Sequence, residues 1–249
     1  MKILVIGEKC IDRFVYGICN RICPEAPVPV FKPMNSTENG GMAENVFNNV
    51  LSLGVECDII TNKNIIEKIR YVDSRSHQMM MRLDKNDFVE TEDKYLHVNS
   101  RLKGYDAIII SDYGKGFLTE GDIELISKDA DCCVFLQTNK IMGEWCVGVD
   151  FIKINEYEYK DAKYSLDNLK RNGHNINLIV TLGEKGCRYN GKYFKIKNRI
   201  EVRDLSGAGD TFLAGLVVKY ISCGDIIKSI SYAQECATKV VQKLGVSVI

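Results

Sequence analysis

The sequence has no surplus of charge of either sign and no long apolar run. Its 33 Lys and Arg residues balance its 33 Asp and Glu residues, so the formal net charge is +0. A balanced surface offers no electrostatic argument for nucleic acid or an anionic membrane as a partner. No apolar stretch approaches the roughly 20 residues that a membrane span needs. The chain is therefore expected to bind neither nucleic acid nor a membrane.

Paired cysteine motifs are missing as well, although the chain contains 10 cysteines. None forms a C-x-x-C pair, and no cluster of His and Cys with the spacing of zinc ligands accompanies Cys19 and Cys23. We interpret the cysteines as reduced, buried thiols of a cytoplasmic protein. The opening MKILVIGE is too short and too strand-like for a signal peptide, and no linker divides residues 1–249, which are expected to form a single domain.

Short apolar runs alternate with helical patterns along the chain. The runs predicted to be buried strands are 2–7, 57–61, 106–112, 132–138, 151–155 and 176–183. Helices are predicted at 119–127, 156–171, 208–221 and 225–243, and a further one opening at Gly40-Gly41. This order predicts the α/β class, with a doubly wound, mostly parallel sheet and helices on both faces. Asn190-Gly191 predicts a hairpin.

Proline is scarce, but three of the four prolines lie in EAPVPVFKP, residues 25–33. Because proline donates no hydrogen bond to a sheet ladder, this segment is expected at an edge or in a flap. Residues 76–84 also have a strand-like pattern.

Glycine and polar clusters recur where the predicted strands end. They are GEKCID (7–12), SDYGKG (111–116), NEYE (155–158) and TLGEKG (181–186), with SGAGD (206–210) before a helix. Ligands of open parallel sheets bind beyond the carboxyl ends of the strands, so this coincidence predicts an active site there.

In SGAGD, Gly207, Ala208 and Gly209 directly precede Asp210. Open backbone N–H groups at a helix start, together with the helix dipole, would hold an anion. Asp210 would then take a proton from a substrate hydroxyl. The spacing alone fits an ordinary loop with a helix-capping Asp equally well.

Each of the other clusters has a functional and a structural interpretation. TLGEKG could cradle nucleotide phosphates, with Lys185 as a point charge, although the Walker A spacing is absent; a tight turn is the alternative. Asn155 and Glu158 could order water around magnesium, or start a solvated helix. The remaining candidates, Asp12 and Asn45 for a polyhydroxylated ligand and Asp112 and Lys115 for the cleft, could equally belong to turns and caps.

Taken together and in this order, these motifs resemble those of the ribokinase-like (PfkB) carbohydrate kinases. DLSGAGDTF (204–212) looks like the D-x-T-G-A-G-D motif, GGMAEN (40–45) like G-G-x-x-x-N, and NEYE like N-x-x-E. Further stretches resemble the kinase domain of bacterial heptose-7-phosphate kinases of ADP-heptose and lipopolysaccharide precursor synthesis. They are 12–32, 75–84, SDYGKG and 240–249, with R-I-x-P-E-A-P-V-P as the most specific.

The resemblance implies phosphoryl transfer from ATP, with Mg²⁺, to a sugar hydroxyl. For the heptose kinases this is the anomeric hydroxyl of D-glycero-β-D-manno-heptose 7-phosphate, giving the 1,7-bisphosphate. Asp210 would be the catalytic base, and Gly207, Ala208 and Gly209 the anion hole. The implied sugar-binding residues are Asp12, Gly40, Gly41 and Asn45, with Asp112 and Lys115 lining the cleft between the two ligands.

The implied nucleotide-binding residues are Asn155, Glu158, Thr181, Gly183, Lys185 and Gly186. Magnesium would be held through the ATP phosphates and water near Glu158, with no direct protein ligand assigned. Residues 12–32 and 75–84 would form a small β lid over the sugar, and paired lids would make a homodimer. By location only, Arg21, Arg75 and Arg82 are candidates to bind a substrate phosphate.

The sequence also departs from the family pattern. Glu8, Cys23, Gln137 and Gln234 stand where Asp, Ser, Asp and Asn are usual. The G-x-D-x-x-G region has no counterpart between Thr61 and Arg70, and no H-x-G-H motif follows, so no nucleotidyltransferase domain is expected. The departures leave two alternatives: a kinase for another sugar or sugar phosphate, or a trimmed, non-catalytic binding protein.

Overall fold

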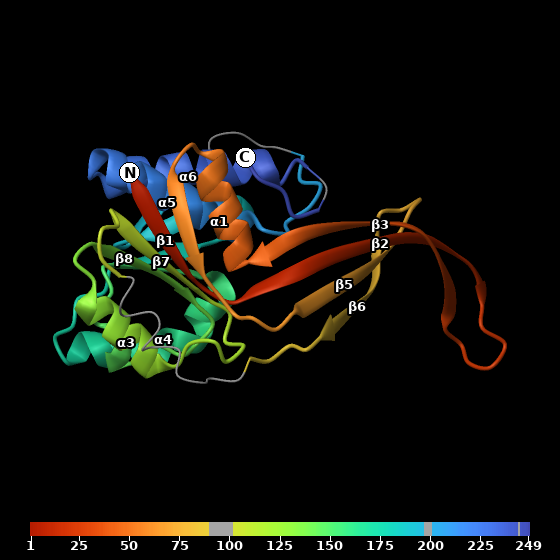
Figure 1. Ribbon diagram of the computed structural model, residues 1–249, viewed down its shortest axis with the longest axis horizontal. Helices are drawn as coiled ribbons and strands as arrows, with labels where there is room; N and C mark the ends of the chain where they lie inside the picture. The colour runs from red at the N-terminus through yellow and green to blue at the C-terminus, as the bar shows by residue number, and fades with distance from the viewer. Residues whose placement is uncertain (90–101, 197–200, 244) are drawn as a thin grey trace.

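A sheet of eight strands forms the body of the protein (Figure 1). The computed structural model describes residues 1–89, 102–196, 201–243 and 245–249. The strands of the body are β1 (Lys2–Gly7), β4 (Glu56–Ile60), β7 (Ala107–Asp112), β8 (Cys133–Thr138), β9 (Phe151–Asn155), β10 (Leu178–Thr181), β11 (Cys187–Tyr189) and β12 (Lys192–Phe194). Their order is β12-β11-β10-β9-β8-β7-β1-β4. All neighbours from β4 to β10 are parallel, whereas β10, β11 and β12 are antiparallel, so the predicted sheet is confirmed.

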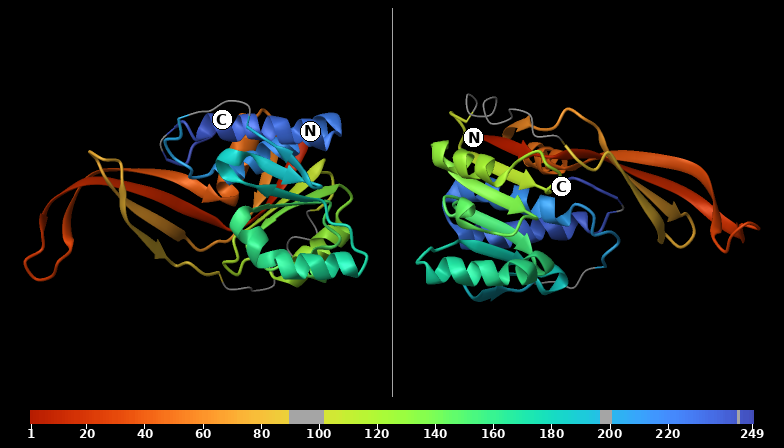
Figure 2. Two further views of the ribbon diagram at one scale, coloured as in Figure 1. Left: turned by 180° about the vertical axis from the view of Figure 1, so that it is seen from behind. Right: turned by 90° about the horizontal axis from the view of Figure 1, so that it is seen from below.

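Helices cover both faces of this sheet (Figure 2). On one face lie α1 (Ala43–Ser52), α5 (Ala208–Cys223) and α6 (Ile226–Val240), and on the other α3 (Glu120–Asp129) and α4 (Glu156–Arg171). Each face of the sheet has its own hydrophobic core, and alternate side chains of β1 belong to different cores. Ile3 and Val5 pack on the side of α1, α5 and α6, whereas Leu4 and Ile6 pack on the side of α3 and α4. Since side chains of a strand alternate between faces, a strand buried on both faces is apolar throughout.

The helices begin in two different ways. Thr119 caps α3, because its Oγ1 accepts the N–H of Asp122 at 3.1 Å and the Asp122 carboxylate accepts the N–H of Thr119 in return. In contrast, α5 starts at Gly207, which has no side-chain cap and a left-handed φ of 78°. The N-terminal N–H groups of α5 are therefore not capped by a side chain.

A second sheet of four strands extends away from the body (Figure 1), and we use the name lid for this sheet. Its strands are β2 (Lys9–Ile22), β3 (Pro29–Met42), β5 (Ile66–Asp73) and β6 (Met79–Lys85), in the order β3-β2-β5-β6. The prolines of residues 25–33 are tolerated because β3 is an edge strand.

The segments predicted to form the lid, 12–32 and 75–84, lie within this sheet and its turns, and the sheet also includes β5 and the rest of β3. Strand β5 was not predicted, because its buried residues Ile66, Ile69 and Val72 recur every third residue and hide the alternation typical of a strand. The helix predicted to open at Gly40-Gly41 begins at Ala43 instead, since both glycines complete β3.

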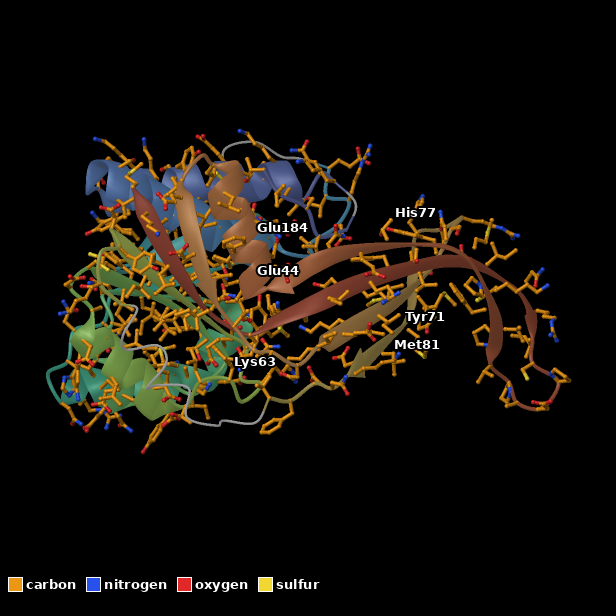
Figure 3. The ribbon with its side chains drawn as sticks, in the orientation of Figure 1. Glu44, Lys63, Tyr71, His77, Met81 and Glu184 are labelled. Atoms are coloured by element: carbon orange, nitrogen blue, oxygen red, sulfur yellow. The ribbon has the colours of Figure 1, made fainter. Side chains whose placement is uncertain are left out.

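The chain passes directly from the body into the lid after β4. Lys63 lies in this short connection, residues 61–65, and Tyr71 and Met81 lie further out on β5 and β6 (Figure 3). No element separates β4 from β5, which agrees with the missing G-x-D-x-x-G region.

The cysteines are all free. Burial raises the pKa of Cys10, Cys57 and Cys187 to about 12, so these thiols remain protonated and unreactive. Among the helices that the structure describes, none has the length and apolar character to span a membrane.

Glu8 joins the body to the turn after β7. Its side chain is fully buried, and its two carboxylate oxygens accept the backbone N–H groups of Tyr113 (2.8 Å), Lys115 (2.9 Å) and Phe117 (3.2 Å). Burial raises the pKa of Glu8, and the charge of Asp112 adds to this effect. The carboxylate therefore fixes the path of residues 113–117.

Replacing Glu8 tests this function. Glu8→Ala leaves three buried N–H groups without their charged acceptor, so we expect the free energy of unfolding in urea to fall by about 3 kcal/mol. The control Glu56→Ala, whose carboxylate is 69% exposed, should change it by at most about 0.5 kcal/mol. Equal losses in the two variants would contradict the structural function of Glu8.

Candidate active site

Asp210 lies in the first turn of α5 and is only 5% exposed. Its carboxylate accepts three hydrogen bonds, from Asn45 Nδ2 at 3.0 Å, the Tyr113 hydroxyl at 2.5 Å and Gln137 Nε2 at 3.2 Å. The donors come from α1, the turn after β7 and the end of β8. Three separate elements thus fix the orientation of one buried carboxylate.

Lys153 supplies a buried positive charge beside this carboxylate. Its Nζ donates to Gln137 Oε1 at 2.7 Å, so Gln137 bridges Lys153 and Asp210. Burial lowers the pKa of Lys153, while the charges of Asp210 and Glu158 oppose this effect. A Cβ on Gly209 would lie 2.9 Å from Nζ, so the ammonium sits against the first turn of α5.

The start of α5 combines a helix dipole with backbone N–H groups that no side chain caps. Gly207 is required there because its φ is left-handed and a Cβ would lie 2.5 Å from Asn45 Nδ2. Of the three residues predicted to form the anion hole, Ala208 already donates its N–H to Leu205 O at 3.3 Å. The Lys153 ammonium and the helix dipole both make this corner favourable for an anion.

The residues predicted to bind sugar lie where the lid meets the body. Gly40 and Asn45 line a cavity of about 500 Å³ together with Tyr16, Asn39 and Lys243. Asp12 is outside that lining and forms an ion pair with Arg70. Gly41 packs on Asp12, because a Cβ there would lie 2.1 Å from Asp12 Oδ2.

The two residues predicted to line the cleft are bound to other side chains. Asp112 is fully buried and accepts from Lys140 Nζ at 2.6 Å and from the Thr138 hydroxyl. Lys115 Nζ pairs with Asp87 Oδ2 at 2.5 Å. Both side chains are therefore engaged in holding strand ends and turns, in the arrangement seen here.

The residues predicted to bind the nucleotide gather at the carboxyl ends of β9 and β10. Asn155 and Thr181 are register partners, and Thr181 Oγ1 donates to Ile154 O at 3.2 Å. Asn155 and Glu158 form a capping box, in which Glu158 Oε2 accepts the Asn155 N–H at 2.6 Å. In this arrangement Asn155 and Glu158 start a helix, which is the second interpretation given for them above. The other carboxylate oxygen of Glu158 is not part of the capping box.

The glycines of the predicted nucleotide loop occupy a tight turn. Gly183, Glu184 and Lys185 form the short 3₁₀ helix η2 (Gly183–Lys185), with Lys185 exposed. A Cβ on Gly186 would lie 2.0 Å from Phe194 O, so Gly186 is needed to close the β11–β12 hairpin onto the turn.

Sequence reasoning missed Tyr113, Lys153, Lys140 and Arg70 as members of this site. Lys153 carried a signal, since it is a lone charge inside the apolar strand FIKIN. Tyr113 lay inside the SDYGKG cluster without being singled out. Gln137, noted only as a departure, connects Lys153 to Asp210.

The chain is similar in sequence to known proteins. Residues 132–248 match the model of the pfkB family of carbohydrate kinases. The bifunctional protein HldE of a Nitratiruptor species is 30% identical over an alignment of 289 positions, covering 98% of this chain and 62% of that protein. Just under half of this chain therefore resembles a pfkB-family carbohydrate kinase domain, and the similarity to HldE extends over nearly all of it. It spans less than two thirds of the length of the HldE proteins that it matches.

Solved structures agree on the fold. The ribokinase of Thermotoga maritima superposes with a TM-score of 0.75 at 17% identity, covering 98% of this chain and 94% of that one. The Arabidopsis thaliana ribokinase complexed with ribose and ATP has a TM-score of 0.68 at 15% identity, covering 98% and 93%. The HldE alignment is longer than the 249 residues of this chain, so this chain is shortened relative to HldE within the aligned region.

The buried Lys153 should make stability depend on pH. Between its lowered pKa in the folded state and the ordinary value of 10.5, the unfolded chain binds more protons, so stability rises with pH there. We expect the unfolding free energy of the wild type, relative to Lys153→Met, to increase as the pH rises toward 10.5. Lys160→Met, at a side chain 63% exposed, should show no such trend. A pH-independent difference for Lys153→Met would refute the buried ammonium.

Proposed function

We propose that this protein is a sugar kinase that transfers the γ-phosphoryl group of ATP to a hydroxyl of a sugar phosphate. The observation that carries the proposal is the corner where Asp210, Lys153 and the start of α5 meet. A carboxylate, a cation and a helix start without a side-chain cap converge there within a buried network. Phosphoryl transfer needs mainly such positioning and charge stabilisation.

In the proposed reaction Asp210 removes the proton of the acceptor hydroxyl. That oxygen bonds to the γ-phosphorus while the bond to the β–γ bridging oxygen breaks, and ADP leaves with its electron pair. Lys153, Gly209 and the helix dipole would stabilise the charge on the transferred phosphoryl oxygens. Asn45, Tyr113 and Gln137 would hold the Asp210 carboxylate toward the acceptor.

The residues at the end of β9 fit a magnesium ion held mostly by phosphates and water. Glu158 has one carboxylate oxygen beyond the one in its capping box, and carboxylate oxygens and water suit Mg²⁺. Among the described residues no group of three or more His, Cys, Asp or Glu side chains is placed to hold a metal. When bound, the ion would neutralise the charge of the ATP phosphates.

The most specific acceptor we propose is D-glycero-β-D-manno-heptose 7-phosphate, converted to the 1,7-bisphosphate. The R-I-x-P-E-A-P-V-P stretch and the similarity to proteins named HldE support this choice. Another sugar or sugar phosphate remains the alternative acceptor, because the segment after Thr61 is short. A non-catalytic binding protein is disfavoured, since binding alone does not need the Asp210 network.

Asp210→Asn tests the base. The amide keeps the shape of the side chain but cannot accept a proton, so we expect kcat for ADP release to fall by about 10²–10⁴-fold. Nucleotide binding, measured by calorimetry, should stay within about twofold of the wild type. Full activity in the variant would contradict the assignment.

Two controls accompany this assay. Asp167→Asn makes the same change at an exposed position of α4 and should retain wild-type turnover. Wild-type enzyme with magnesium chelated by EDTA should release no ADP. If wild-type enzyme with magnesium also releases no ADP in the presence of any sugar or sugar phosphate, the non-catalytic alternative is favoured.

We further propose that the protein forms a homodimer through the lid. The edge strand β6 carries the apolar side chains Met79, Met80 and Met81, which are 56%, 43% and 55% exposed. Exposed apolar patches of this kind mark interaction surfaces.

Sedimentation of the wild type should therefore show a dimer that Met81→Asp weakens by about tenfold or more, because a charge would be buried at the contact. Leu125→Asp, an exposed position on α3 of the body, is the control and should leave the dimer intact. A monomeric wild type at micromolar concentration would overturn this proposal.

A further inference from the structure

One face of the lid carries three cationic side chains and the carboxylate of Asp12. We call this the inner face and define it by Asp12, Phe14, Lys68, Arg70 and Arg82. Strand register places these residues on one side of the sheet, since Asp12 aligns with Lys68, Phe14 with Arg70, and Arg70 with Arg82.

Two of the three cations on the inner face have carboxylate partners. Arg70 pairs with Asp12, and Arg82 Nε lies 2.8 Å from Asp84 Oδ1. In the described part of the chain, no ion pair with a carboxylate includes Lys68. Lys68 is half-buried, and a cation in such a position favours an anionic ligand.

Tyr113 connects Lys68 with the base. Lys68 Nζ lies 5.3 Å from the centre of the Tyr113 ring, and the hydroxyl of the same ring is bound to Asp210 Oδ1 at 2.5 Å. The cation and the base are therefore separated by about one aromatic ring. A sugar with its reacting hydroxyl at one end and a phosphate at the other would span this separation.

Cys10 packs beside Asp12 at the junction of lid and body. Its thiol donates to Asp12 Oδ2 at 3.9 Å, and a Cβ on Gly41 would lie 2.7 Å from Cys10 Sγ. Burial raises the pKa of this thiol to about 12, so Cys10 adds no charge of its own to the junction.

Two contacts hold the guanidinium of Arg70 in place. Its guanidinium lies 5.0 Å from the centre of the Phe14 ring, and its bond to Asp12 uses Nη1. Stacking and the ion pair fix the plane of a group with five N–H donors. Donors beyond those facing Asp12 remain for phosphate oxygens.

We propose that Lys68 and Arg70 bind the phosphate group that the acceptor sugar already carries, so that the enzyme selects a phosphorylated sugar over the free sugar. This inference rests on the proposed function, because it assigns a task within the acceptor site of that kinase. It replaces Arg21, Arg75 and Arg82 as candidates. Arg82 binds Asp84 through both Nε and Nη2, whereas Arg70 binds Asp12 through Nη1. Arg21 and Arg75 are exposed toward the far end of the lid.

Calorimetric binding to the full chain tests the proposal, with D-glycero-D-manno-heptose 7-phosphate, fructose 6-phosphate and free D-glycero-D-manno-heptose as probes. Lys68→Met keeps the length of the side chain without its charge. We expect it to raise the Kd of the sugar phosphate that binds best by about tenfold or more. The Kd of the free sugar should be the same as in the wild type.

Two further variants make the test specific. Lys85→Met removes a lysine from the opposite face of the same sheet, where Lys85 pairs with Glu67 at 3.5 Å, and should bind as the wild type does. Arg70→Lys retains a positive charge beside Asp12 while losing the planar donors, so it should weaken sugar-phosphate binding with the fold preserved.

The outcomes separate this inference from the proposed function. Wild-type affinity in Lys68→Met, equal wild-type affinity for free and phosphorylated sugar, or no sugar-phosphate binding by the wild type would each overturn the inference. Lys68-dependent binding without ADP release would uphold it and refute the kinase. ADP release with an unchanged KM in Lys68→Met would uphold the kinase and refute the phosphate site.

Discussion

The buried charge of Asp210 is the constraint on which the rest of the site depends. A carboxylate removed from water needs donors and an opposite charge, or its burial costs several kcal/mol. Here Asn45, Tyr113 and Gln137 supply the donors, and Gln137 relays the charge of Lys153. These residues come from α1, β8, β9 and the turn after β7, so satisfying one carboxylate ties together four parts of the fold.

The lid reaches this site through a second buried carboxylate. Glu8 stands between β1 and β2, and it holds the turn that carries Tyr113. The lid begins one residue after Glu8, so the start of the lid and the position of the Tyr113 hydroxyl depend on the same side chain. Any movement of β2 relative to the body would therefore act on the hydrogen bonds of Asp210 as well as on the acceptor site.

The sequence predicts the sheet well because its strands are buried on both faces and are uniformly apolar. It also indicates Asp210 and the polar ends of β9 and β10, since glycine clusters follow the strands. It does not indicate that Asp112 and Lys115 are held by Lys140 and Asp87, because these pairs join residues 28 positions apart. Strand β5 escapes prediction for a related reason: its burial is set by β2 and β6 on either side.

The direct passage from β4 to β5 leaves β4 as the border of the described sheet. A border strand offers unpaired backbone groups to any other chain, and short length and charge are the common protections against such pairing. Strand β4 has five residues, and Glu56 and Asp58 both bind Lys2 Nζ, at 3.2 Å and 2.9 Å. The missing segment thus leaves β4 at the edge of the sheet, and this strand carries two charged residues, Glu56 and Asp58, that discourage assembly into fibres.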